Sequence, residues 1–186
     1  MRTFFTADTH FGDRRVLQID RRPFATLAEH DAGLVELWNA AVSAEDEVWH
    51  LGDFARIQPA AAVEARLALL NGRKHLIVGN NDGPATLSAP GWASVRHYAE
   101  IDLAGKRLVL AHYAFRTWNG IGRGAINLHG HSHGRLKPQP RQYDVGVDCW
   151  ACRPVTLETI LASRRRAARA AGPKLNRDSA SPAEGA

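Results

Sequence analysis

The sequence has 186 residues and a formal net charge of +5, but residues 164–186 alone hold six Lys or Arg against two Asp or Glu. The rest of the chain is close to neutral, so its composition does not favour a nucleic-acid-binding protein, which needs a broad positive surface. No apolar run is long enough to span a membrane and no secretory signal precedes the first predicted strand, so we expect a cytoplasmic protein.

The first half of the chain alternates between predicted strands and predicted helices. Apolar and β-branched runs predict strands at residues 3–7, 48–51 and 75–78. Apolar residues at helical spacing predict an amphipathic helix over residues 26–42, with Thr26 as its N-cap, and a second helix over residues 59–70. This alternation is typical of an α/β domain.

The second half is richer in strands. Residues 95–103 and 106–111 are separated by a short Ala-Gly turn and predict a β-hairpin. Further strands are predicted at residues 125–128 and 143–147, before a final helix that begins at residue 156. Two such halves fit a pair of sheets with helices on the outside.

Two features near the end of the chain carry no function in our interpretation. Residues 171–186 are rich in Pro, Ser, Ala and Gly and predict a disordered tail, which leaves one domain over residues 1–170. Cys149 and Cys152 have C-x-x-C spacing, but there is no second pair that would complete a zinc site. We interpret them as incidental thiols.

Seven side chains with oxygen or nitrogen donors lie where strand-like runs end and turns begin. They are Asp8, His10, Asp53, Asn80, His112, His131 and His133. Taken alone, Asn80 is explained by its Gly- and Asn-rich turn, and a single His such as His112 is more often a core residue. Because the pattern recurs at five strand ends, a shared cleft is the better explanation. Carboxylates and imidazoles bind Zn, Fe or Mn, so these donors can hold two metal ions and indicate a hydrolase.

The spacing within two of these clusters supports convergence. Asp8 and His10 are two residues apart, so both side chains would project to one face if strand geometry persisted beyond residue 7. His131 and His133 flank a small Ser beside Gly130, which suits a metal site better than a packed core.

The order and type of these residues resemble the calcineurin-like metallophosphoesterase superfamily, whose pattern is D-x-H, G-D-x-x-R, G-N-H-[DE], a lone His and G-H-x-H. The match runs from Asp8 to His133. The resemblance implies an α/β fold, a four-layer αββα sandwich in which helices flank two facing mixed β-sheets. It also implies that one metal ion is bound by Asp8, His10 and His133, that a second is bound by Asn80, His112 and His131, and that Asp53 bridges the two.

The chemistry implied by the resemblance is metal-dependent hydrolysis of a phosphate ester. Two divalent cations about 3.5–4 Å apart acidify a bridging water, whose hydroxide attacks the ester, and they clamp the substrate oxygens. Only Asp8 and Asp53 among the seven donors are carboxylates, so the site stays electropositive and should attract a small anionic phosphoester such as a nucleotide. We favour Mn as the metal, although Fe, Zn and Ni are also compatible with a His-rich site.

One position departs from the family pattern. The motif G-N-H-[DE] reads G-N-N-D in this chain, so Asn81 stands where the family has a His close to the leaving group. Asn cannot act as a general acid, although its amide still donates a hydrogen bond. We therefore favour a phosphodiesterase over a monoesterase, with Asn81 and Asp82 as candidate catalytic residues. The alternative is that His97 or His129 supplies the proton.

Several arginines and aromatic residues are candidates for binding the substrate. Arg56 completes the G-D-x-x-R motif, and we interpret it as a supporting residue on the phosphate side. In segment 113–124, Phe115 and Trp118 could stack a base beside two arginines, or they could simply pack the loop against the body. The arginines that follow the first motif either line the same cleft or are solvated; they are Arg14, Arg15, Arg21 and Arg22.

Two other functions remain open at this point. A nuclease of the same superfamily would need a long positive track, which the near-neutral body does not favour. A non-catalytic binding module, as in a retromer subunit similar to this fold, has no reason to keep two complete metal sites. The sequence therefore favours the small-substrate phosphoesterase, without a membrane partner.

Overall fold

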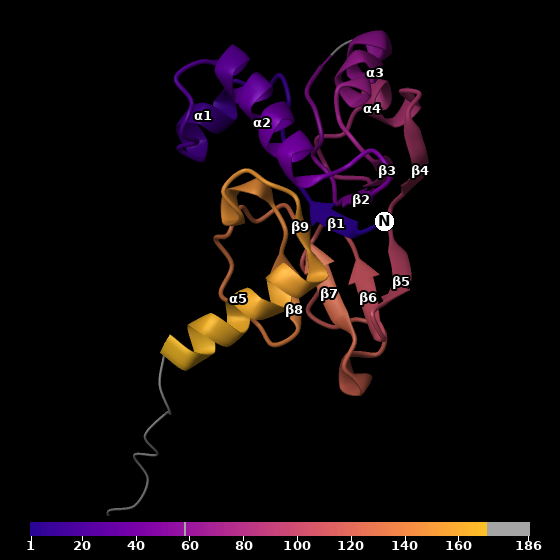
Figure 1. Cartoon of the computed structure of the whole chain (residues 1–186), viewed down its shortest axis with the longest axis vertical. Helices are drawn as coiled ribbons and strands as arrows, with labels where there is room; N and C mark the ends of the chain where they lie inside the picture. The colour runs from indigo at the N-terminus through magenta and orange to yellow at the C-terminus, as the bar shows by residue number, and fades with distance from the viewer. Residues whose placement is uncertain (58, 171–186) are drawn as a thin grey trace, which may run out of the picture.

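The computed structural model describes residues 1–57 and 59–170, with side chains up to Ser163 (Figure 1). The predicted disordered tail at residues 171–186 lies outside the described residues, as do the side chains of the basic run that begins at Arg164. Within the described part, the chain forms two mixed β-sheets and several helices, so the predicted α/β sandwich is confirmed.

The first sheet contains five strands in the order β4-β3-β2-β1-β9. Four of them run parallel, and they are β1 (Thr3–Thr6), β2 (Glu47–His50), β3 (Arg73–Ile77) and β4 (Trp92–Arg96). The short strand β9 (Val155–Thr156) pairs antiparallel with β1 at the edge. The carboxyl ends of β1, β2 and β3 therefore lie side by side.

The second sheet contains four strands in the order β5-β6-β7-β8. Its strands are β5 (Ala99–Leu103), β6 (Lys106–Leu110), β7 (Ile126–His129) and β8 (Gln142–Asp144). The β5–β6 pair is the predicted antiparallel hairpin, whereas β6, β7 and β8 are parallel neighbours. The carboxyl ends of β6 and β7 are thus adjacent as well.

Helices cover the first sheet. They are α1 (Arg15–Ile19), α2 (Leu27–Ala41), α3 (Ala60–Ala68) and α4 (Pro84–Ser88), and Figure 1 shows them gathered at one end of the molecule, away from α5 (Leu157–Ala170). The Thr26 hydroxyl accepts the N–H of Glu29 and caps α2, as the sequence predicts. None of the helices described in residues 1–170 has the length and apolarity that crossing a bilayer requires.

Alternation along the strands divides the core into two clusters, because successive strand residues face opposite sides of a sheet. Phe4 lies in the cluster that contains Trp38 of α2 and Leu67 of α3. The next residue, Phe5, lies between the two sheets in the cluster that contains Leu110 and Leu128. The inter-sheet cluster thereby holds the carboxyl ends of both sheets at one edge of the sandwich.

The outer face of the second sheet is covered by the segment between β6 and β7. Trp118 is 7% exposed, lies in a small cluster with Val109 and Ala125, and donates its indole N–H to Ala125 O at 3.0 Å. The short 3₁₀ helix η1 (Ile121–Arg123) follows it. Of the two predicted roles for Trp118, the structure supports packing.

Two predicted strands have the wrong boundaries. The run 95–103 is not one strand, because residues up to Arg96 pair with β3 in the first sheet and residues from Ala99 pair with β6 in the second. The chain changes sheet at positions 97 and 98 without a Gly or Pro to signal it. The predicted strand 143–147 ends at Asp144, and the 3₁₀ helix η2 (Val147–Cys149) begins three residues later.

We predict a pH effect from Asp46, whose carboxylate ties the turn before β2 to the start of β1. It accepts the backbone N–H groups of Ser43 at 3.0 Å and Arg2 at 2.7 Å, which lower its pKa to about 2. A folded-state pKa below the ordinary value stabilises the fold above that ordinary value, and this stabilisation is lost as pH falls through about 2. In urea unfolding, Asp46→Asn should lose less stability than the parent between about pH 4 and pH 2. Parallel pH curves for the two proteins would contradict this.

Candidate dinuclear metal centre

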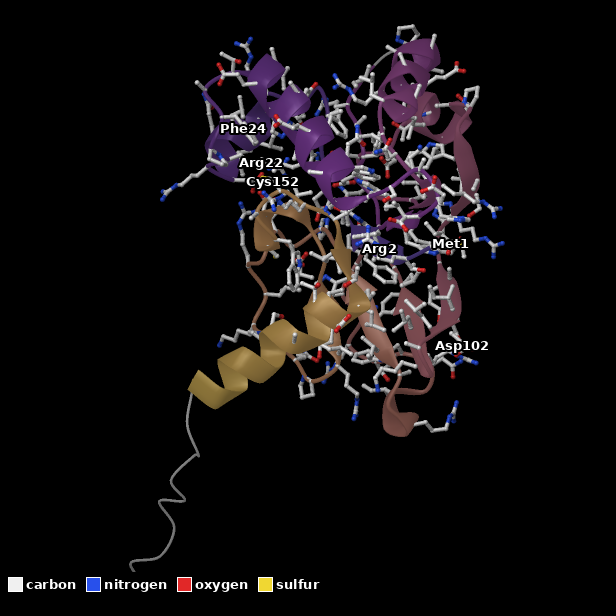
Figure 2. The ribbon with its side chains drawn as sticks, in the orientation of Figure 1. Met1, Arg2, Arg22, Phe24, Asp102 and Cys152 are labelled. Carbon is white, nitrogen blue, oxygen red and sulfur yellow. The ribbon has the colours of Figure 1, made fainter. Side chains whose placement is uncertain are left out.

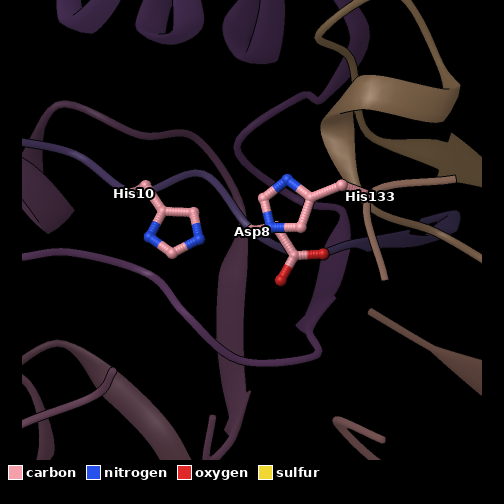
Figure 3. A group of neighbouring side chains, drawn as sticks. All are labelled: Asp8, His10 and His133. Atoms are coloured by element: carbon pink, nitrogen blue, oxygen red, sulfur yellow. The ribbon is translucent and has the colours of Figure 1, made fainter. Parts of the chain in front are cut away.

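The structure brings all seven predicted donors to one edge of the sandwich. Asp8, His10 and His133 form a first group whose ligand atoms lie within 4.8 Å of one another, and Figure 3 shows the carboxylate and two imidazoles gathered together. A second group within the same limit is formed by Asp53, His112 and His131.

Asp53 lies between the two groups. Its Oδ2 is 3.6 Å from Nε2 of His10 in the first group, and its Oδ1 is 3.5 Å from Nε2 of His112 in the second. Asn80 joins the second group, because its Oδ1 lies 3.0 Å from the same His112 nitrogen. One carboxylate thus faces both sets of donors, which is the geometry that a bridging ligand needs.

Five of the donors have left-handed backbone conformations, although none of them is Gly. Their φ values lie between 48° and 66°, and the residues are Asp8, His10, Asp53, His131 and His133. The premise that strand geometry persists through Asp8 and His10 is therefore wrong, since β1 ends at Thr6. Such conformations cost on the order of 1–3 kcal/mol each and concentrate at functional sites. Here they turn each loop sharply so that its side chain enters the shared cleft.

Two glycines allow the loops to approach so closely. Gly52 has φ of 96°, and a Cβ there would lie 2.7 Å from the Gly79 backbone and would collide with Nδ1 of His112. A Cβ at Gly130 would lie 2.8 Å from Oδ2 of Asp8. Because any side chain at these positions would displace a donor, the glycines are part of the construction of the site.

Hydrogen bonds on the far side of two rings orient their metal-facing nitrogens. His112 donates from Nδ1 to Leu51 O at 2.7 Å, which leaves the Nε2 lone pair free. His133 donates from Nδ1 to Oδ2 of Asp148 at 2.8 Å, which does the same for its own Nε2. Metal-binding imidazoles are held in this way by carbonyls and carboxylates.

Burial makes the donor set suitable for a cation. It lowers the pKa of His10 to about 4, and it also lowers the pKa of His112 and that of His131 below their ordinary values. These rings are neutral at physiological pH and can offer a lone pair. Burial raises the pKa of Asp8 well above its usual range because the site gives its carboxylate too little compensating charge. A divalent cation bound there would supply that charge, so the residues fit a metal ion.

The two residues after Asn80 surround Asp53 from different sides. Asn81 donates its backbone N–H to Oδ1 of Asp53 at 2.8 Å and its side-chain amide to Oδ2 at 2.7 Å. Asp82 is buried and accepts the backbone N–H groups of Asp53 at 2.9 Å, Phe54 at 2.8 Å and Gly79 at 2.8 Å. Burial raises its pKa to about 6 in spite of these hydrogen bonds. Asp82 thus fixes the loop that presents Asp53.

Three further candidates do not line the cleft above the donors. Among the described residues that line the cleft, neither His97 nor His129 appears. His97 is exposed at the junction of β4 and β5, and His129 is buried with its Nδ1 2.9 Å from Gly130 O. Arg56 is exposed and does not line the cleft formed by the described residues, although its backbone N–H bonds Phe11 O at 2.8 Å. The structure therefore gives no support to a proton donor at His97 or His129.

The cleft over the donors has a volume of about 370 Å³, and two arginines stand at its rim. Arg15 pairs with Asp13 at 2.6 Å, and Arg135 pairs with Asp20. Both arginine side chains are more than half exposed. Of the other arginines near the first motif, Arg14 and Arg21 are exposed, whereas Arg22 is buried.

Sequence reasoning missed Asp148, and it also missed one useful aromatic residue in segment 113–124. Asp148 follows directly after the predicted strand 143–147, so the rule that found the other donors at strand ends could have found it. Tyr113 is 49% exposed, and its ring centroid lies 4.5 Å from that of His131. Within this segment it is Tyr113, rather than Phe115 or Trp118, that contacts a predicted ligand.

Comparisons with known proteins agree with this geometry. A family model described as the calcineurin-like phosphoesterase superfamily domain matches residues 1–150, a range that contains all seven donors. The gene 66 protein of Mycobacterium phage D29 is 34% identical over 178 residues, covering 79% of this chain and 88% of the phage protein. The gene 66 protein of Mycobacterium phage L5 is 29% identical over 181 residues, covering 80% of this chain and 87% of that protein.

A solved structure has the same fold. It is a protein of unknown function from Aquifex aeolicus, which is 21% identical to this chain and aligns with a TM-score of 0.67. The alignment covers 87% of this chain and 98% of the Aquifex chain.

We predict that Asp82→Asn lowers the unfolding free energy by about 1–3 kcal/mol, because one amide oxygen cannot satisfy the three buried N–H groups that the carboxylate accepts. Urea unfolding of the metal-free protein measures this loss. The matched control is Asp102→Asn, which removes an exposed carboxylate paired with Arg107 and should cost much less stability, because water screens an exposed ion pair. Equal losses in the two variants would show that Asp82 does not hold the loop.

Proposed function

Because the chain belongs to the calcineurin-like phosphoesterase superfamily, we propose that it is a metal-dependent hydrolase of phosphate esters that prefers small phosphodiesters. The observation that carries the proposal is the convergence of four imidazoles, one amide and two carboxylates from five strand-end loops, five of these donors lining one cleft. When bound there, two divalent cations would acidify a water molecule and withdraw negative charge from the phosphate.

In this proposal the chain's own residues divide into two ligand sets. Asp8, His10 and His133 would hold one cation, Asn80, His112 and His131 would hold the other, and Asp53 would be shared by both. The distances from Asp53 to His10 and to His112 support its shared role. The donor types are compatible with Mn, Fe, Zn or Ni, and we take Mn as the first metal to test.

The shape and charge of the cleft support a small anionic substrate. A volume of about 370 Å³ suits a compact ligand rather than an extended chain. Arg15 and Arg135 stand at the rim with part of each guanidinium open to solvent, so either can bind a substrate oxygen in addition to its Asp partner. Tyr113 offers an exposed ring beside His131, where a nucleotide base could stack.

The preference for diesters rests on the described residues of the cleft, among which we find no free group suited to protonate the leaving group. Asn81 has no group that can release a proton near neutral pH, and its backbone N–H and one amide N–H donate to the carboxylate of Asp53. The non-ligand carboxyl groups in the cleft belong to Asp13 and Asp20, and each is paired with an arginine. Esters whose leaving group departs without protonation should therefore react faster than alkyl monoesters.

We expect metal-stripped protein to hydrolyse bis-p-nitrophenyl phosphate only after Mn is added, and to hydrolyse it faster than p-nitrophenyl phosphate. Asp53→Ala should reduce the diester rate to background because it removes the ligand shared by both ions. Asp102→Ala, which removes an exposed carboxylate on β5, should keep the parent rate. A metal-independent rate, or an unchanged rate in Asp53→Ala, would refute the proposed centre, and faster monoester hydrolysis would refute the diester preference.

A second experiment tests the role of Asn81. Asn81→His should raise the rate on phenyl phosphate, whose leaving group is poor, by about 10²-fold or more relative to the rate on p-nitrophenyl phosphate, since general acids contribute 10²–10⁴ when protonation limits the reaction. Asn81→Ala serves as the control, because it also removes the hydrogen bond from the side-chain amide to Asp53 but adds no general acid. If the two variants change both rates alike, the leaving group does not depend on position 81.

A further inference from the structure

Arg22 is buried in a way that the proposed chemistry does not explain. Its side chain is only 1% exposed, and a buried guanidinium is costly unless each of its donors is paired. It belongs to the loop between α1 and α2, and Figure 2 shows it where this part of the chain meets the turns before β9.

Except for His30 of α2, the partners of this guanidinium lie next to the first donor group. Nε and Nη2 donate to the two carboxylate oxygens of Asp148, each at 2.9 Å. Nη2 also donates to the main-chain carbonyl of Asp8 at 2.6 Å, and Nη1 donates to that of Thr9 at 2.9 Å. Nη1 lies 2.9 Å from Nε2 of His30 as well. Arg22 therefore holds the backbone of the Asp8–His10 turn directly.

Asp148 links Arg22 to His133, the third residue of the first group. Its Oδ2, which is bonded to Arg22, also accepts the Nδ1 proton of His133 at 2.8 Å. The 3₁₀ helix that carries Asp148 is fixed to the first strand, because Val147 donates its backbone N–H to Ala7 O at 3.0 Å. The arginine–carboxylate pair therefore holds Asp8 through its main-chain carbonyl and His133 through its ring, and it holds the carbonyl of Thr9, which directly precedes His10.

We propose that Arg22 and Asp148 are positioning residues for the first cation: they hold Nε2 of His133 toward Asp8 and His10 with its lone pair free. The inference depends on the proposed function in one respect, which is that Asp8, His10 and His133 form a metal site. A carboxylate behind a metal-binding imidazole fixes both the ring orientation and the tautomer, and its loss typically costs 10–100-fold in metal affinity. The second group has its own orienting partner in Leu51 O, so it does not depend on this pair.

The first experiment measures metal binding rather than catalysis. Mn or Zn is titrated into metal-free parent, Asp148→Asn and Arg22→Lys proteins against a competing chelator. We expect the affinity of one of the two sites to fall about 10–100-fold in Asp148→Asn, and the other to stay within about threefold. The metal affinity of Arg22→Lys should lie between those of the parent and Asp148→Asn, because an ammonium keeps the charge but cannot bind both carboxylate oxygens as a guanidinium does.

The chain offers a matched control for the loss of an arginine fork. Arg107 binds both carboxylate oxygens of Asp102, from Nε at 2.9 Å and from Nη2 at 3.0 Å, on the exposed face of the β5–β6 hairpin. Asp102→Asn should leave both metal affinities unchanged. If Asp148→Asn weakens both sites equally, or neither of them, the positioning role is overturned.

A second measurement needs no substitution and covers the case in which a variant fails to fold. In metal-free parent protein at alkaline pH, where the ring is neutral, the ¹⁵N shifts of the His133 ring should show the proton on Nδ1 and an unprotonated Nε2. A proton on Nε2 would overturn the proposal. Because neither experiment uses a substrate, a protein that positions its metals as stated but hydrolyses no ester would contradict the proposed function alone.

Discussion

Three of the five loops that carry a predicted ligand turn through left-handed backbone conformations just after their strands end, and the site depends on this constraint. Left-handed backbones at residues such as Asp8 and Asp53 are unfavourable by themselves. They are offset by hydrogen bonds that cross between the loops, from Asp8 N to Gly52 O at 2.9 Å and from His10 N to Asp53 O at 3.0 Å. The loop after β1 and the loop after β2 therefore stabilise each other.

The sheet topology decides which loops can meet. Parallel pairing of β1, β2 and β3 places three carboxyl ends next to one another, and parallel pairing of β6 and β7 does so in the second sheet. The hydrophobic cluster around Phe5 and Leu128 packs the two sheets against each other, so that the carboxyl ends of their strands lie at the same edge. A contact such as Gly130 N to His112 O, at 3.0 Å, then joins the last two loops. The convergence of the donors is thus a property of the core as much as of the ligands.

Electrostatics completes the arrangement. Burial leaves the imidazoles of His10 and His112 neutral and leaves the carboxylate of Asp8 short of compensating charge, which is a poor state for a dry interior and a good one for binding cations. The charged residues that surround these donors are paired with one another. Asp148 has a pKa lowered by its hydrogen bonds to His133 and Arg22, which outweigh its burial. The centre of the site therefore lacks compensating positive charge, whereas its surroundings are paired in charge and hydrogen-bonded.

By itself, the sequence determined the α/β class and the place of the seven candidate donors at strand ends, because short apolar runs and turn residues are local signals that survive without any tertiary contact. Tertiary structure alone decided the rest. The change of sheet between Arg96 and Ala99 depends on which partner strand is available, and the packing of Trp118 depends on the open face of the second sheet. Arg22 and Asp148 are 126 residues apart and share no spacing that a pattern could detect. Burial, pairing and orientation are long-range properties, so they exist only once the two sheets have packed.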